Sequence, residues 1–177
     1  MLCQFSFQNY KSYRDEVTLD LCPAKITEHP EHLIKQKDSG ESFLPLAVIY
    51  GPNGGGKSNV IGAFNHLRNK ILDVLMNVGG SENHIKDAEG SGLITFNRKA
   101  RPQRVYFIFD KSYAKEPTSW SISFIRHGYE YKYSISATEK KVVEESLYAK
   151  DLKTQDIHML FERGKNVKFG ELLFDIP

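Results

Sequence analysis

The stretch Gly51-Pro52-Asn53-Gly54-Gly55-Gly56-Lys57-Ser58 decides how this 177-residue chain is interpreted, because it satisfies the pattern G-x-x-x-x-G-K-[ST] at every position. Its glycines allow positive φ angles and remove side chains that would block an approaching phosphate. Successive backbone N–H groups can then form an anion-binding nest, and a helix that follows directs its positive N-terminal end at the same anion. The pattern therefore predicts a phosphate-binding loop of the Walker A type.

The predicted loop gives a role to each of its polar side chains. Lys57 is expected to reach the β- and γ-phosphates of a nucleoside triphosphate, and the hydroxyl of Ser58 is expected to bind Mg²⁺. We therefore expect ATP and Mg²⁺ as ligands, with Ser58 as the metal ligand, and the sequence identifies no catalytic residue. The candidate nucleotide-binding residues are Gly51, Pro52, Asn53, Gly54, Gly55, Gly56, Lys57, Ser58 and Asn59.

The segments that flank the loop favour this interpretation over a glycine-rich turn that only links a strand to a helix. The continuous apolar run Leu44–Tyr50 predicts a strand that is buried on both faces. From Lys57 to Met76, apolar residues recur at spacings of three and four, which predicts an amphipathic helix. The apolar stripe of this helix consists of Val60, Phe64, Leu67, Ile71 and Leu75.

The first part of the chain predicts a β-hairpin. Residues 2–9 and 15–22 alternate apolar and polar side chains, and the polar segment Lys11–Tyr13 between them is expected to form the turn. Pairing Phe5 with Leu19 places both apolar sets on one face of the hairpin.

The cysteine content indicates free thiols. Two cysteines are too few for a disulfide framework. In the predicted register Cys3 points to the core face and Cys22 to the opposite face, so we expect two reduced thiols in a reducing compartment. The first five residues lack the basic region and long apolar stretch of a signal peptide, and no apolar run approaches the length of a membrane span. We therefore expect a cytoplasmic protein without a membrane partner.

The rest of the chain predicts short strands joined by turns. Residues 23–43 are expected to form an irregular connection, and residues 77–92, rich in glycine, asparagine and charge, a mobile loop. The predicted fold class is α/β, with a mixed sheet rich in antiparallel strands around one strand–loop–helix unit. The predicted strands are Val105–Phe109, Trp120–Ile125, Glu130–Ser136 and Val142–Tyr148, followed by the less distinct segments Ile157–Phe161 and Val167–Phe174.

A family resemblance extends the argument. The segment Val48–Ile61 closely resembles the Walker A region of ABC-type ATPases of the SMC and RecF kind, in which Asn53 and Asn59 are typical. Gly55 departs from that group, which more often has Ser or Ala there. The segment Phe7–Asp15 resembles the group's first strand, N-F-[RK]-S-F-x-D. Later segments, at 107–109, 129–133 and 144–148, look like strands of bacterial AAA-type proteins with an ABC-like core.

This resemblance implies a P-loop NTPase fold and a place in a longer protein. Residues 1–177 would form the N-terminal lobe of an ABC-like P-loop ATPase domain, without the C-terminal lobe that carries the signature and the Walker B motif. The nearest Walker B candidate ends at Asp110, but Lys111 follows in place of Glu. We interpret Val105–Asp110 as an antiparallel strand rather than a metal-binding strand.

The resemblance also implies a function and partners. The lobe would bind ATP, and hydrolysis and ATP-driven homodimerisation would require the complete protein. Many such proteins are thought to act in phage defence or toxin–antitoxin pairs, which implies a nuclease or a toxin as a partner. Two alternatives stay open. One is a non-hydrolysing nucleotide-binding fragment that acts as an interaction module, and the other is a P-loop kinase, for which the sequence shows no arginine lid.

Several weaker features each have two interpretations. Residues near the predicted hairpin turn either contact the nucleotide or form a solvated turn; they are Asn9, Lys11, Ser12 and Arg14. Two basic runs either contact nucleic acid or form solvated surface, which is usual for charge runs. They comprise Arg98, Lys99, Arg101 and Arg104, and Arg163, Lys165 and Lys168. The net charge of +2 gives no large basic field that would favour nucleic acid.

Two further groups are assigned structural roles. The stretch His29-Pro30-Glu31-His32 has side chains of ligand type, but Pro30 lies between them and no second pair is nearby, so it predicts no metal site. The aromatic residues of the later strands are expected to pack in the sheet rather than to form a stacking platform. They are Trp120, Tyr129, Tyr131 and Tyr133.

Overall fold

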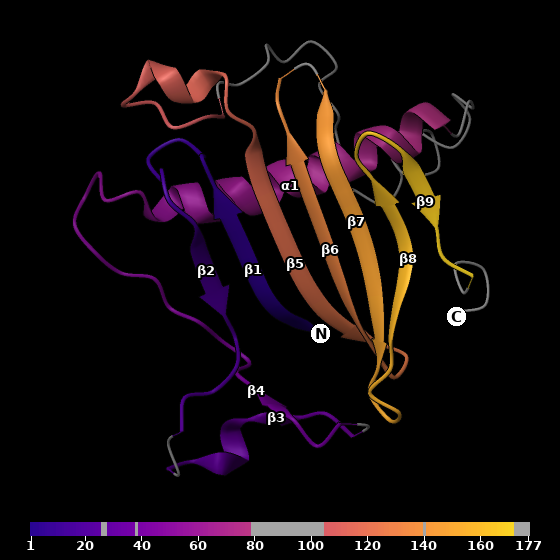
Figure 1. Ribbon diagram of the computed structural model, residues 1–177. Coiled ribbons are helices and arrows are strands. Elements are labelled where there is room, and N and C mark those ends of the chain that lie inside the picture. The colour runs from indigo at the N-terminus through magenta and orange to yellow at the C-terminus, as the bar shows by residue number, and fades with distance from the viewer. Residues whose placement is uncertain (26–27, 38, 79–104, 140, 172–177) are drawn as a thin grey trace, which may run out of the picture.

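The computed structural model describes residues 1–25, 28–37, 39–78, 105–139 and 141–171. A seven-stranded sheet has the order β2-β1-β5-β6-β7-β8-β9, and every neighbouring pair in it is antiparallel. The helix α1 (Lys57–Val78) runs across one face of this sheet (Figure 1). The strands are β1 (Leu2–Gln8), β2 (Val17–Asp20), β5 (Thr118–Arg126), β6 (Tyr129–Ala137), β7 (Val142–Asp151), β8 (Ile157–Arg163) and β9 (Val167–Phe169).

The N-terminal hairpin forms in the predicted register. Phe5 pairs with Leu19, and both lie on the face that contacts α1. Cys3 is buried, Cys22 is exposed, and both are free thiols, as the register predicts. The alternation of apolar and polar side chains thus fixes the pairing, because a slip by one residue would turn both phenylalanines of β1 to the other face.

The later hairpins confirm the predicted strands between residues 118 and 169. His127 and Gly128 form the two-residue turn between β5 and β6, with φ angles of 50° and 82°. Such turns require positive φ at both positions, and their twist matches that of the flanking strands. Arg126 and Tyr129 close the hairpin as the last pair of its register. Of the predicted segment Val167–Phe174, residues 172–174 lie outside the described part.

The main core lies between α1 and the sheet. Val60 and Leu67 of the predicted stripe are buried there together with Ala63, and Phe64 packs against this core, so the stripe faces the sheet over its first three turns. Ile71 was predicted to belong to the stripe but is 36% exposed, and the side chain of Leu75 is outside the described part. The sheet contributes Phe5, Phe7, Trp120, Ile135 and Ala137 to this core.

The prediction of a buried strand at Leu44–Tyr50 is wrong. Within the described residues no backbone hydrogen bond joins 45–50 to another segment, and Leu46, Val48 and Tyr50 are more than 70% exposed. The apolar run has strand-forming side chains, but a strand also needs a neighbour for its backbone groups. Among the described residues, the bond of this segment to another one is that from the Leu44 N–H to the carbonyl of Leu21.

The predicted strand Val105–Phe109 is also not formed. Its backbone groups pair instead with the turn that follows β1, where an isolated parallel bridge joins Phe107 to Lys11. The Lys11 N–H donates to the carbonyls of Val105 and Tyr106, and the Ile108 N–H donates to the Lys11 carbonyl. Val105 is nevertheless buried in the main core. A short 3₁₀ helix, η2 (Lys111–Ala114), follows.

The two predicted connections turn out differently. Residues 23–43 contain a 3₁₀ turn, η1 (Pro30–His32), and a short hairpin of β3 (Ile34–Lys35) and β4 (Ser42–Phe43), so they are not wholly irregular. Phe43 anchors the hairpin in a small cluster with Cys3 and residues of the sheet. Of the predicted loop 77–92, residues 77 and 78 belong to α1 and the others lie outside the described part. No helix among the described residues is long and apolar enough to cross a membrane.

His66 lies at the interface between α1 and the sheet. Its ring stacks on the indole of Trp120 with centroids 5.2 Å apart and planes inclined by 15°. Burial, together with the positive charges of Lys70 and Lys11, lowers the pKa of His66 to about 4. The imidazole is therefore neutral at neutral pH and packs as part of the core.

We predict that His66 makes the fold sensitive to mild acid. The unfolded chain takes up a proton at this histidine near pH 6.5, whereas the folded chain takes it up near pH 4, so stability falls as pH decreases between these values. From pH 7 to pH 5 the loss due to His66 should be about 1–2 kcal/mol, after an allowance for its partial exposure. Urea unfolding of the wild type and of His66→Phe at both pH values measures it, and equally steep losses in the two proteins would contradict it.

Candidate nucleotide-binding site

The glycine-rich segment 51–56 forms an exposed turn that leads directly into α1. The Gly55 N–H donates to the Pro52 carbonyl at 3.1 Å, which closes the turn. Gly54 and Gly56 have φ angles of 80° and 84°, in the region that glycine adopts without strain. Because α1 begins at Lys57, the N–H groups of its first turn and the positive end of its dipole lie at this turn.

Lys57 folds back onto the loop. Its Nζ donates to the carbonyls of Gly51 and Pro52, both at 2.8 Å. Ser58 is the second residue of α1 and is exposed, so its hydroxyl is open to solvent. The loop therefore presents an ammonium group, a hydroxyl group and helix N-terminal N–H groups within one short segment. This set of groups can bind a phosphate together with a divalent cation.

The turn that follows β1 packs against the loop. The Asn59 Nδ2 donates to the Ser12 Oγ at 2.8 Å. The Tyr13 hydroxyl donates to the Gly56 carbonyl at 3.4 Å. A Cβ atom built on Gly56 would lie 2.6 Å from the Ser12 Oγ. The two segments therefore approach so closely that a side chain at position 56 would displace the Ser12 hydroxyl.

Asn9 has a structural role that the sequence did not reveal. Its side chain was predicted either to contact nucleotide or to be solvated, but it is buried, with 3% of its surface exposed. Its backbone has a φ of 52°, a conformation in which Asn is enriched among non-glycine residues. The Oδ1 accepts from the Phe107 N–H at 2.8 Å. The Nδ2 donates at 3.1–3.2 Å to the carbonyls of Tyr113, Glu116 and Pro117.

The other three residues predicted near the nucleotide lie at different places on this turn. Ser12 contacts the loop through Asn59. Lys11 forms the bridge to Phe107 with its backbone and places its Nζ 5.4 Å from the Tyr10 ring centroid. Arg14 is exposed and pairs with the adjacent Asp15 at 2.9 Å.

Asp110, the nearest Walker B candidate, caps a helix. Its carboxylate accepts hydrogen bonds from the backbone N–H and the hydroxyl of Ser112, at 2.9 and 2.8 Å. These bonds lower the pKa of Asp110 below its usual range. The residue thus acts as the N-cap of η2, and the antiparallel strand that we assigned to its segment is absent.

In the second basic run, at residues 163–168, one of the three basic side chains forms an ion pair. Arg163 pairs with Glu145 at 2.5 Å, and Glu145 also accepts a hydrogen bond from the Tyr133 hydroxyl. Burial and this carboxylate raise the pKa of Tyr133. Lys165 and Lys168 are exposed. The earlier basic run, residues 98–104, lies outside the described part.

Two hollows occur on the described surface. One of about 360 Å³ is lined by Ser12, Tyr13, Arg14, Asp15, Val17 and Phe107. Ser12 and Tyr13 of this lining also contact the segment 56–59. The other, of about 630 Å³, is bordered by serines of β1, β5, β6 and β7 and by charged residues of the β8–β9 hairpin. None of residues 51–58 lines either hollow, and the smaller one is connected to the predicted nucleotide site only through Ser12 and Tyr13.

A glycine-rich loop that opens a helix on a mostly antiparallel sheet is compatible with a P-loop ATPase-like domain. Residues 46–166 match the family described as "AAA domain, putative AbiEii toxin, Type IV TA system", and the chain belongs to this family. The match begins five residues before the loop and ends in the β8–β9 turn. No curated protein and no solved structure matches the chain.

We predict that a side chain at position 56 destabilises the fold. Gly56→Ala should cost about 1–3 kcal/mol of unfolding free energy, since it combines a strained φ with the contact to Ser12. In a Ser12→Ala background the same substitution should cost less, because the crowding hydroxyl is gone. Urea unfolding measures both costs, and Gly164→Ala, whose Cβ would meet nothing within 4 Å, is the control. Equal costs in the two backgrounds would rule out the contact as the cause.

Proposed function

We propose that the chain binds ATP with Mg²⁺ at residues 51–59. The observation that carries this proposal is the loop with two glycines in left-handed conformations at the N-terminus of a 22-residue helix. Membership of an AAA family supports nucleotide binding in general terms. ATP and Mg²⁺ are proposed because the loop presents an ammonium group for the β- and γ-phosphates and a hydroxyl group for the cation.

Lys57 would change partners when the triphosphate binds. Its ammonium group, which donates to two loop carbonyls, would transfer these hydrogen bonds to phosphate oxygens. A charged phosphate is a stronger acceptor than a neutral carbonyl, so the exchange is favourable. Ser58 would then hold Mg²⁺ between the loop and the phosphates.

The base and ribose would lie towards the turn that follows β1. The hollow of about 360 Å³ there is lined by Tyr13, Arg14 and Phe107, which offer aromatic surface and a cationic group next to the loop. Ser12 is already bonded to Asn59 and holds the turn against the loop. We therefore assign nucleotide contact to Tyr13 and Arg14 and a positioning role to Ser12.

The finer assignment rests on the sequence resemblance. Residues 1–177 would be the Walker A lobe of an ABC-like ATPase of the SMC and RecF kind, located in the cytoplasm. Hydrolysis and ATP-driven homodimerisation would belong to the complete protein. The family description mentions a toxin and a toxin–antitoxin system, which supports a partner protein. A role in phage defence is proposed from the sequence resemblance alone. Nucleic acid is an alternative partner for the exposed Lys165 and Lys168, whereas Arg163 of the same run is paired with Glu145.

We predict that an ATP analogue binds the purified chain in the presence of Mg²⁺ and that this binding depends on Lys57. Calorimetry should show affinity at least about tenfold lower for Lys57→Ala, because a hydrogen bond to a charged group contributes about 1.5–3 kcal/mol. Ser58→Ala should weaken the dependence of binding on Mg²⁺. Lys153→Ala, which removes an exposed lysine in the β7–β8 turn, is the matched control. Equal affinities of the wild type and Lys57→Ala would place the nucleotide elsewhere.

We further predict that the chain by itself releases phosphate from ATP no faster than its Lys57→Ala variant. Within the described residues no carboxylate is bonded to Lys57 or Ser58, and that of Asp110 is used to cap η2. Hydrolysis needs a group that orients the attacking water. A colorimetric phosphate assay on both proteins measures the rates. Turnover of the wild type well above the variant would show that the chain contains its own hydrolytic group.

A further inference from the structure

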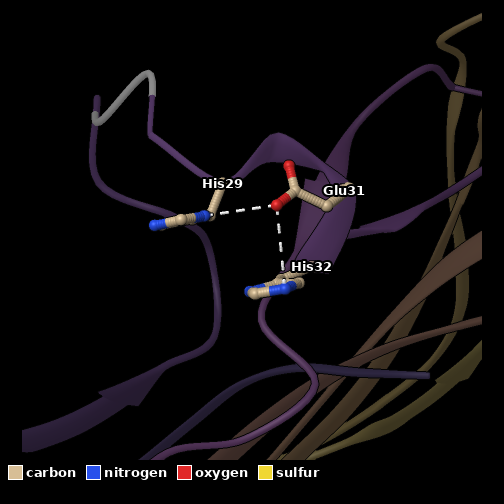
Figure 2. A group of neighbouring side chains, drawn as sticks. All are labelled: His29, Glu31 and His32. Atoms are coloured by element: carbon tan, nitrogen blue, oxygen red, sulfur yellow. Dashed lines mark hydrogen bonds and ion pairs between the residues drawn. The ribbon is translucent and has the colours of Figure 1, made fainter.

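Three side chains of ligand type converge in the connection between β2 and β3. We name His29, Glu31 and His32 the His29 cluster. The His29 Nδ1 lies 3.2 Å and the His32 Nε2 lies 3.7 Å from the same Glu31 oxygen, Oε1. The three ligand atoms all lie within 4.8 Å of one another. Figure 2 shows the contacts of the two rings with the same oxygen of the Glu31 carboxylate.

The backbone of the turn brings these side chains together. Pro30 opens η1, and its fixed φ suits the first position of such a turn. His29 precedes it with a φ of 55°, and the His32 N–H donates to the His29 carbonyl at 3.1 Å. The two imidazole rings are therefore stacked, with centroids 5.3 Å apart and planes inclined by 9°. The sequence predicted that Pro30 separates the ligands, whereas the turn that it begins folds them onto one another.

The chemistry of the cluster selects a transition metal. Two imidazole nitrogens and one carboxylate oxygen form a ligand set that Zn²⁺ uses, whereas Mg²⁺ prefers oxygen ligands alone. With metal–ligand bonds of about 2.0–2.2 Å in a tetrahedral site, neighbouring ligand atoms are about 3.3–3.6 Å apart. The two separations from Glu31 Oε1, 3.2 and 3.7 Å, lie just outside this range on either side. Because the two ring planes are nearly parallel, one exposed imidazole would rotate about its side-chain bonds to direct both nitrogens at one ion.

We propose that the His29 cluster binds a divalent transition metal of the Zn²⁺ type through His29 Nδ1, His32 Nε2 and a Glu31 carboxylate oxygen. The three side chains are 62–74% exposed, so water can supply the remaining ligand. Bound metal would fix the connection that carries the β3–β4 hairpin. The site is built from residues outside the proposed nucleotide loop and does not depend on nucleotide binding.

Calorimetric titration of the chain with ZnCl₂, without nucleotide and after removal of any affinity tag, tests the proposal. All proteins carry Cys22→Ser, because cysteine thiols bind Zn²⁺ and the exposed thiol of Cys22 would compete for the added metal. We expect one site per chain with a dissociation constant of roughly micromolar order, which corresponds to about 8 kcal/mol. Each of His29→Asn, Glu31→Gln and His32→Gln should weaken binding by at least about tenfold, since loss of an outer partner alone costs about 10–100-fold.

Matched controls separate this site from general surface binding. His127→Asn removes an exposed histidine with the same left-handed conformation as His29, and it should leave the affinity unchanged. Co²⁺ in place of Zn²⁺ should give visible absorption bands that disappear in the double variant His29→Asn with His32→Gln. Binding that survives in this double variant, or that is weaker than millimolar in the parent protein, would overturn the proposal. Circular dichroism of each variant without metal confirms that it is folded.

Discussion

The hydrogen bonds of the Asn9 side chain are the constraint on which the rest of the structure depends. This buried amide joins the end of β1 to the segment 105–117, which has no strand of its own. The Thr118 hydroxyl adds a bond to the Asn9 carbonyl at the start of β5. Moving either segment would leave buried polar groups without partners, at a cost of about 1–3 kcal/mol of unfolding free energy for each group. These hydrogen bonds therefore fix the two segments relative to each other. The turn at residues 9–13 is thereby fixed relative to the central strands of the sheet.

The turn at residues 9–13 also positions the glycine-rich loop. Ser12 and Tyr13 contact the loop at Asn59 and Gly56, and Tyr10 of the same turn is buried against the core below the helix. A Cβ built on Gly62 would lie 3.2 Å from the Tyr10 hydroxyl. The helix α1 therefore also lies close to residues 9–13 at Gly62. The position of the loop is therefore set by the sheet through one turn, rather than by a strand that precedes it.

The sequence predicted the parts of the fold that depend on local patterns. The pairing of Phe5 with Leu19 follows from alternation, and the start of α1 at Lys57 follows from the change of period after the glycines. Leu44–Tyr50 was mispredicted because an apolar run indicates burial only where another segment covers it. The hydrogen bonds of Asn9 and the proximity of the three side chains of the His29 cluster were missed because both depend on non-glycine residues with positive φ, which composition and spacing do not reveal.

The two ends of the loop are held by different kinds of interaction. At the helix end, Gly56 and Asn59 are bonded to a turn that belongs to the main core. At the other end, Gly51 follows the exposed residues 45–50, and its carbonyl is bonded to the Lys57 ammonium group. The Lys57 ammonium group, which stabilises the Gly51 end of the loop, is thus the group that would bind a phosphate. Because removing Lys57 also removes both of its loop bonds, its substitution changes the free loop as well as the bound one. The helix end lacks this coupling, since its contacts do not involve the lysine.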